Sequence, residues 1–259
     1  MKKAAAILLG ASLASSAAIA VEQWSGSYSA INLGFGFNPG DNGELEFERA
    51  DGSDNSAAIN NAFGENFEGK FNSGALLGFE LGSDYQSGNW VYGAALDISM
   101  ADISQEQSAF SATPATYIER RELDFVSTIS GRLGWASDLP VLPYVRAGLA
   151  YGDVSYSWEG NSGAFRGDNG DDGDGLGYMV GFGAEFKLDK QLSLAVEYRY
   201  LNLGDADFET YFSGENDMLG QPTGASAAFG TSAQGGSIAQ GTDEDFDFQS
   251  VSVQLRYRF

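Results

Sequence analysis

The chain ends in Val251-Ser252-Val253-Gln254-Leu255-Arg256-Tyr257-Arg258-Phe259, and this stretch decides the fold. Apolar or aromatic side chains alternate strictly with polar ones, which is the two-residue period of a β-strand with two unlike faces. Both arginines fall on one face, and nothing charged falls on the other. The stretch therefore predicts a strand whose apolar face and ionised face have different surroundings.

The same alternation recurs along the chain, in segments separated by Gly-, Asn- and Asp-rich connections. Long apolar runs at a helical period are scarce. With the terminal stretch, these segments give eight predicted strands, at about 27–37, 71–81, 90–100, 123–135, 144–152, 177–188, 191–201 and 250–259.

The two faces of these segments differ in a way that selects one architecture. No position on the apolar face is charged; this face includes Phe71 and Leu123. The other face collects glycines and the charged residues Glu80, Asp97, Asp124, Arg132, Arg146, Glu185, Lys187, Glu197, Arg199, Arg256 and Arg258.

A soluble β-sandwich, the alternative all-β architecture, would turn its large residues inward and has no reason to gather glycine on its solvent face. A barrel in lipid does the reverse, with an apolar belt outside and a polar lumen. We therefore predict an all-β fold, an eight-stranded antiparallel transmembrane β-barrel.

Connection lengths support the barrel. Long connections (38–70, 101–122, 153–176 and 202–249) alternate with short ones, as extracellular loops alternate with periplasmic turns. In the longest loop, Phe208–Phe212 and Phe246–Phe248 could pair as an extra hairpin, which leaves a ten-stranded barrel open. Aromatic residues fall near both predicted interfaces: Trp24, Trp90, Trp135, Tyr257 and Phe259 at the periplasmic side, and Phe37, Phe71, Tyr151, Tyr178 and Tyr200 at the outer side.

The first twenty residues have the pattern of a secretory signal peptide. Met1-Lys2-Lys3 is positive, residues 4–17 are small or apolar, and Ala18-Ile19-Ala20 fits a cleavage site. We expect residues 1–20 to be removed and residues 21–259 to form one barrel domain in the outer membrane.

Composition excludes several functions. The formal net charge of −22 disfavours nucleic acid as a partner, because phosphate would be repelled. The chain has no cysteine, so neither disulfides nor thiolate metal sites are available. It also has no histidine. The enzyme families among outer-membrane barrels resemble one another in using a catalytic histidine as general base. We expect neither an enzyme nor a cofactor.

Three motifs carry a resemblance to a known family. Trp24-Ser25-Gly26-Ser27-Tyr28 with Asn32-Leu33-Gly34-Phe35-Gly36 resembles the start of small opacity-type, OmpA-like outer-membrane barrels of Gram-negative bacteria. Residues 194–200 resemble that family's penultimate strand. The ending resembles the signal that the barrel-assembly machinery recognises, formed here by Val251, Val253, Leu255, Tyr257 and Phe259. The resemblance implies an eight-stranded barrel and leaves function largely open.

The ionised face has two interpretations. A salt-bridged plug is favoured, because a buried charge persists only when it is paired and an eight-stranded lumen is just wide enough for side chains to fill it. An ion path through a narrow porin is the alternative. Asp124, Arg256 and Arg258 lie near the barrel mouths, where we expect them to be solvated.

The long loops carry most of the acidic residues. We expect them to keep the surface hydrated, with divalent cations bridging loop carboxylates to lipopolysaccharide phosphates as a sharper hypothesis. The run 168–175 looks like a calcium loop, but Met179 stands where an EF-hand needs Glu. Arg120-Arg121 are candidates to contact a lipid phosphate.

Taken together, the sequence predicts a structural outer-membrane barrel that contributes to envelope integrity, displays acidic loops and binds external ligands through them. Its expected partners are outer-membrane lipid, lipopolysaccharide and the barrel-assembly machinery.

Overall fold

The structure is a computed structural model that describes residues 24–40, 43–49, 51–111, 115–160, 173–205, 209–212, 237–243 and 245–259. The predicted signal peptide and the acidic run 168–172 lie outside the described residues. None of the helices in the described part of the chain is long and apolar enough to cross a bilayer.

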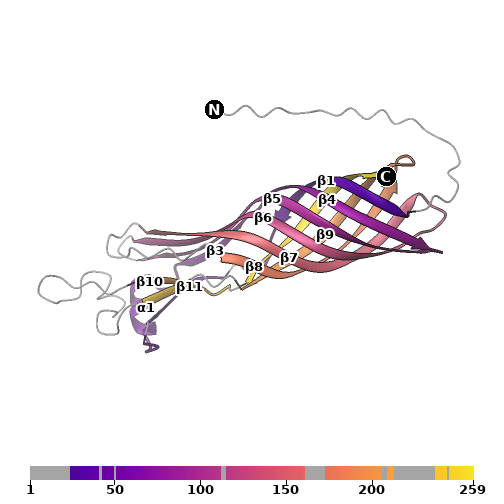
Figure 1. Cartoon of the computed structure of the whole chain (residues 1–259). Helices are drawn as coiled ribbons and strands as arrows, with labels where there is room; N and C mark the ends of the chain where they lie inside the picture. Colours follow the sequence, from indigo (N-terminus) through magenta and orange to yellow (C-terminus); the bar gives the residue numbers. More distant parts are fainter. Residues whose placement is uncertain are drawn as a thin grey trace, which may run out of the picture.

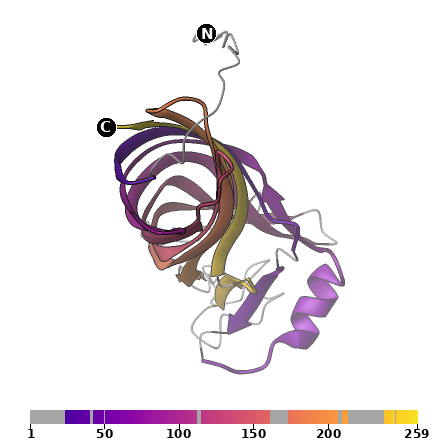
Figure 2. The same cartoon turned by 90° about the vertical axis from the view of Figure 1, so that its right-hand side faces the viewer.

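Eight antiparallel strands close into a ring, seen end-on in Figure 2. Their order around the ring is β5-β4-β1-β12-β9-β8-β7-β6, and β6 pairs with β5 again. The strands are β1 (Gly26–Phe37), β4 (Gly74–Ser87), β5 (Trp90–Phe110), β6 (Thr116–Trp135), β7 (Val141–Gly160), β8 (Gly173–Lys187), β9 (Leu192–Asp205) and β12 (Asp245–Arg258). The predicted barrel is confirmed, and a sandwich is excluded.

The first and last strands seal the cylinder. β1 pairs with β12 from Tyr28↔Arg258 to Phe37↔Gln249. Short turns follow β4, β6 and β8, so these turns and the C-terminus lie at one end of the barrel (Figure 1). The long connections lie at the opposite end, as the sequence predicts.

Several strands continue well beyond the predicted segments. β5 and β6 stay paired as far as Phe110↔Thr116, within a region predicted to be a loop. The outer face of this extension is charged: Arg120 lies 3.0 Å from Glu106 and 3.2 Å from Glu159. Because hydrocarbon does not tolerate such a face, this part of the barrel projects beyond the membrane.

A β-bulge at Asp124 reverses which side chains of β6 face the lumen. The β6–β7 register shifts between Leu123 and Phe125, which leaves Asp124 as an extra residue. Leu123 is consequently buried and Asp124 exposed. The predicted positions, Leu123 outside and Asp124 in the lumen, were both wrong, because strict alternation does not survive an inserted residue.

A second break separates Phe71 from the strand to which it was assigned. Phe71 belongs to β3 (Phe67–Asn72), which pairs with β5 in a register shifted from that of β4. Its ring lies 6.4 Å from that of Phe246 and packs against the buried apolar cluster. Phe71 is therefore an inward residue and not part of an outer aromatic girdle.

A small second sheet and one helix form a cap beyond the long-loop end (Figure 1). The sheet has the order β10-β11-β2, and its strands are β2 (Leu45–Arg49), β10 (Glu209–Phe212) and β11 (Ser237–Gly241). The helix is α1 (Ser56–Phe63). The sequence left open a hairpin between residues 208–212 and Phe246–Phe248. In the structure β10 pairs with β11 instead, and Phe246–Phe248 belong to β12. In the described chain, this sheet lies outside the ring and the barrel is not ten-stranded.

The interior has two layers. Toward the long-loop end it is apolar, and this core continues into the cap; it includes Leu76, Ile103, Leu123, Met179, Phe248, Phe47, Phe63 and Trp158. Toward the short-turn end it is ionised. Trp24, predicted in the aromatic girdle at the periplasmic side, is instead buried with Val91, Ala136 and Leu142 beneath the ionised layer.

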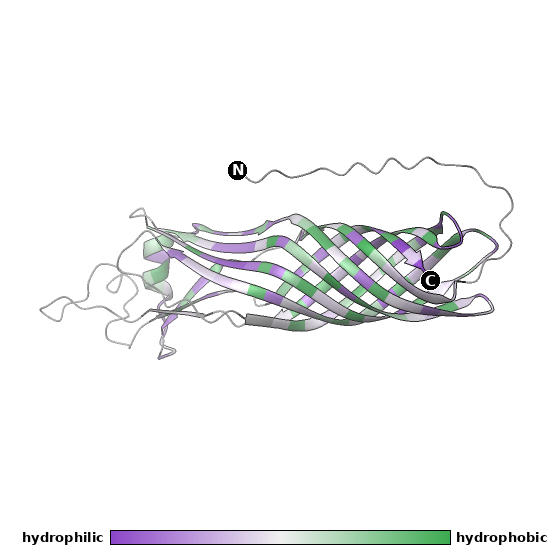
Figure 3. Ribbon diagram, turned by 45° about the horizontal axis from the view of Figure 1, so that its top comes forward, coloured by the Kyte–Doolittle hydropathy of each residue, from purple (hydrophilic) through white to green (hydrophobic). Residues whose placement is uncertain are grey.

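The outside of the ring carries an apolar belt, which appears as green bands in Figure 3. Its exposed members include Ile31, Leu33, Phe35, Leu77, Phe79, Leu81, Leu96, Ile98, Ile129, Leu149, Val180, Phe182, Val251, Val253 and Leu255. Trp90 and Trp135, whose ring centroids are 4.7 Å apart, lie at its short-turn edge. Such a belt with flanking aromatics matches a lipid-facing surface.

Candidate functional site

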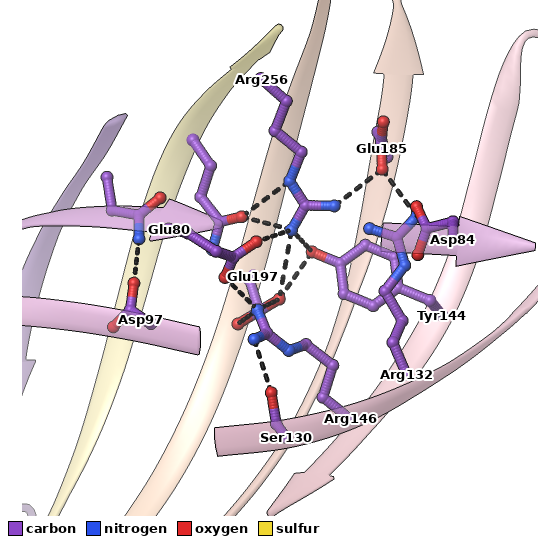
Figure 4. A network of polar contacts seen from close by, with 12 residues as sticks. Glu80, Asp84, Asp97, Ser130, Arg132, Tyr144, Arg146, Glu185, Glu197 and Arg256 are labelled. Carbon is purple, nitrogen blue, oxygen red and sulfur yellow. Dashed lines mark hydrogen bonds and ion pairs between the residues drawn. The ribbon is translucent and has the colours of Figure 1, made fainter. Parts of the chain in front are cut away.

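The candidate site is the ionised layer of the lumen, most of which is drawn in Figure 4. Alternate residues of the barrel strands point inward, so side chains distant in sequence meet on the barrel axis. Each of the ten ionised side chains of this layer is at most 8% exposed: Glu80, Asp84, Asp97, Glu185, Glu197, Arg132, Arg146, Arg199, Arg256 and Arg258. We call this set the lumen network.

Arg146 of β7 occupies the middle of the lumen network. Its Nη1 lies 2.6 Å from Glu80 of β4 and 3.3 Å from Glu197 of β9. Its Nη2 donates a hydrogen bond of 2.7 Å to the Ser130 hydroxyl. One guanidinium thereby ties together four strands that span the cylinder.

Arg256 of β12 links two halves of the lumen network. Its Nη1 lies 2.7 Å from Glu185 of β8, and its Nη2 lies 3.3 Å from Glu80. Closer to the short-turn end, Arg132 and Arg258 share the carboxylates of Asp84 and Glu185 at 2.7–3.3 Å. Asp84 and Glu185 are therefore each bound by at least two guanidiniums.

Arg199 marks the boundary with the apolar layer. It contacts Glu197 and lies 3.2 Å from Asp97, which also accepts a hydrogen bond from Asn32. Beside it is a cavity of about 20 Å³, lined partly by Asn32 and Ser252. That volume holds about one water molecule.

Two tyrosines complete the packing between the arginines. The Tyr144 hydroxyl donates a hydrogen bond of 2.7 Å to Glu197, while Arg132 lies 4.5 Å above the Tyr144 ring. Arg256 and Arg258 lie 5.0 Å and 5.3 Å from the ring of Tyr28. Arginine suits this role because its planar group can pair with a carboxylate and stack on an aromatic face together.

The lumen network is electrically balanced. Five carboxylates face five guanidiniums, so its formal charge is zero. Burial of an ion costs several kcal/mol, and only close pairing with further hydrogen bonds compensates for that cost. The arrangement therefore fills the lumen with charges that pair with one another.

Of the residues predicted on the ionised face, the structure brings Glu80, Asp97, Arg132, Arg146, Glu185, Glu197 and Arg199 into the lumen network. Arg256 and Arg258, expected to be solvated, are buried in it. Lys187 is half-buried at the rim, with its ammonium 4.8 Å from the Trp24 ring.

Sequence reasoning missed several members of the site. Asp84 lies three residues beyond the predicted end of its strand, although Glu80-x-Gly82-x-Asp84 continues the inward alternation and could have revealed it. The Ser193 hydroxyl, for example, donates a hydrogen bond of 2.6 Å to Glu185. The neutral members of the site were missed because they leave no charge signal on either face: Tyr28, Tyr144, Asn32 and Ser193.

The Arg120-Arg121 pair does not point outward as a unit. Arg120 is held by Glu106, Glu122 and Glu159, whereas Arg121 is buried and donates a hydrogen bond of 2.6 Å to the Asp243 carbonyl. A joint contact with a lipid phosphate is therefore excluded.

One buried acid lies outside the membrane span. Glu119, on the inner face of the projecting part of β6, is 3% exposed. Burial raises the pKa of its carboxyl to about 8, although nearby Arg121 opposes that shift.

No group of three or more acidic side chains in the described residues is placed to hold a metal ion. The acidic run that resembles a calcium loop lies largely outside them. At the C-terminus, Val251, Val253, Leu255, Tyr257 and Phe259 are all exposed on the outer face of β12.

Comparisons with known proteins agree with this geometry. Residues 6–259 match the outer membrane protein beta-barrel domain family. The 31 kDa outer-membrane immunogenic proteins of Brucella melitensis and Brucella suis are each 25% identical over 182 residues, which is 70% of this chain and 72% of theirs. The crystal structure of the outer membrane protein OprG from Pseudomonas aeruginosa superimposes with a TM-score of 0.51 at 13% identity, covering 91% of this chain and 96% of that one.

Proposed function

Because the chain belongs to the outer membrane protein beta-barrel family, we propose that it is a sealed structural barrel that contributes to envelope integrity and displays an acidic, ligand-binding cap. The lumen has no transport role in this proposal, and the barrel performs no catalysis.

The balanced lumen network carries the proposal. An ion path needs a continuous hydrated route, and a selective pore commonly lines its constriction with charges of one sign. Here both signs are present in equal number, their side chains are almost fully buried, and the cavity beside Arg199 holds about one water. The apolar layer lies directly above the network.

The proposal extends to partners. Outer-membrane lipid would surround the apolar belt, and the barrel-assembly machinery would engage the exposed C-terminal residues Val251, Val253, Leu255, Tyr257 and Phe259. Lipopolysaccharide would adjoin the outer face of the part of the barrel that projects beyond the membrane. Divalent cations would bridge its phosphates to exposed acids such as Glu122 and Glu159.

Conductance in a planar bilayer tests the seal. We expect the purified wild-type barrel to pass no steady current, because its lumen offers no open route. Arg132→Ala removes a guanidinium that serves both Asp84 and Glu185, and we expect intermittent leakage from it.

Arg120→Ala is the matched control, since it removes an arginine from ion pairs on the outside of the barrel. It should leave the bilayer silent. Steady wild-type channels whose conductance changes in Arg132→Ala would establish the narrow porin instead.

A further inference from the structure

A cavity of about 480 Å³ opens on the cap between β2 and α1. Binding sites for small ligands typically measure about 300–1,000 Å³. The cavity lies away from the lumen network, and the sealing function does not use it.

The cavity follows the edge of a β-strand. Every residue of β2, from Leu45 to Arg49, lines it. A cavity over one face of a strand would be lined by alternate residues, because successive side chains point to opposite faces. β2 is the last strand of its sheet within the described chain, and β11 covers its other edge.

Hydrogen bonds fix which main-chain groups face the cavity. The Glu44 carbonyl accepts a 2.8 Å hydrogen bond from the Thr242 amide. Glu44 and every second residue after it therefore direct their main-chain N–H and C=O groups toward β11. Leu45 and Phe47 direct theirs to the opposite side, where the Asn55 side chain donates a 3.0 Å bond to the Phe47 carbonyl. The amide and carbonyl of Leu45 therefore face the cavity edge.

The walls combine acidic and apolar groups. Glu44, Glu46, Glu48 and Asp54 line the cavity, as do the half-buried side chains of Ile59 and Phe67. Arg49 is the one basic residue of the lining, and its guanidinium donates to the Asp54 carbonyl. Such walls complement an occupant that is cationic and partly apolar.

We propose that this cavity binds an extended, basic peptide segment, which adds to the edge of β2 as a further strand. Main-chain hydrogen bonds would fix the register of the peptide. Lysine or arginine side chains on one face of the peptide meet Glu46 and Glu48, and apolar side chains on the other meet Ile59 and Phe67.

Binding of a dye-labelled peptide of alternating lysine and valine to the folded full chain in detergent tests the proposal. The variant Glu46→Gln/Glu48→Gln should bind about tenfold more weakly, since it removes two exposed carboxylates that pair with lysines of the peptide. The same peptide with alternate amides N-methylated should bind negligibly, because it cannot pair with a strand edge.

Glu68→Gln/Glu122→Gln is the matched control, because it removes the same charge from exposed acids that do not line the cavity. It should bind like the wild type. Absence of binding, equal weakening in both double variants, or indifference to N-methylation would each overturn the proposal. The inference rests on the ligand-binding cap of the proposed function and not on the sealed lumen. Conductance tests the lumen and peptide binding tests the cap, so the two failures are distinguishable.

Discussion

Arg256 illustrates how much stability one lumen side chain carries. It is fully buried between Glu80 and Glu185, so its removal leaves both carboxylates with fewer partners in a dry interior. We predict that Arg256→Ala lowers the free energy of unfolding by about 3–5 kcal/mol, measured by urea titration in lipid vesicles.

Arg120→Ala provides the comparison. Its ion pairs are partly solvated, and pairs of that kind contribute about 0–1 kcal/mol. Equal losses in the two variants would show that burial does not set the energy of the lumen network.

Glu119 makes the stability of the projecting part of β6 depend on pH. Its pKa is about 8 in the folded protein against 4.5 ordinarily, so the folded state retains a proton that the unfolded state loses. The contribution of protonated Glu119 to the free energy of unfolding is complete below pH about 4.5 and is lost as pH rises through about 8.

Hydrogen exchange of the projecting part of β6 measures this effect. Between those two values we predict that protection falls with rising pH, by at most about tenfold per unit beyond the intrinsic change in exchange rate. Glu119→Gln should remove the dependence. A slope that persists in Glu119→Gln would assign it to another group.

At the scale of the strand, inward glycines set how closely neighbours approach. A Cβ on Gly148 of β7 would lie 2.1 Å from the Ile129 carbonyl oxygen, whereas one on Gly131 of β6 would meet nothing nearer than 4.0 Å. We predict that Gly148→Ala lowers the free energy of unfolding by about 1–3 kcal/mol.

Gly131→Ala is the control and should unfold at the wild-type urea concentration. Both variants add one methyl group in paired strands. Gly148 faces the lumen and Gly131 the outer surface, and only the methyl group at Gly148 would meet backbone at close range. A harmless Gly148→Ala would mean that β6 and β7 can separate without cost.

The sequence predicts the strands better than their limits. Alternation of apolar with ionised residues locates all eight barrel strands and most of the lumen network, because lipid and lumen impose opposite demands on the two faces. It fails where the outer face becomes polar, as at Glu106 and Glu122, since the pairing continues there without the signal.

Local irregularities were equally hidden. The bulge at Asp124 has no sequence signature, yet it turns Leu123 inward and brings Arg121 and Glu119 to the inner face of β6. The three-stranded cap sheet was not predicted, because its pairings join β2 to residues far along the chain.

At the scale of the whole molecule, the charges are sorted by environment. The lumen network is neutral, the belt is uncharged, and the projecting region and cap carry exposed acids such as Glu46, Glu48 and Glu159. This sorting permits a chain of formal charge −22 to sit in lipid, because the excess charge remains in water.

The central claim is that apolar side chains face hydrocarbon while ionised groups fill a closed cylinder. The chain has no cysteine, so single cysteine substitutions can carry a spin label without interference. Leu96 and Phe182 lie in the exposed belt, and Glu122 and Glu159 lie on the projecting outer face.

Collision rates with oxygen, which concentrates in lipid, and with a water-soluble nickel chelate test this claim most directly in reconstituted vesicles. We predict that labels at Leu96 and Phe182 meet oxygen and are shielded from nickel, while labels at Glu122 and Glu159 meet nickel. Nickel access at Leu96 and Phe182 equal to that at Glu122 would contradict the account.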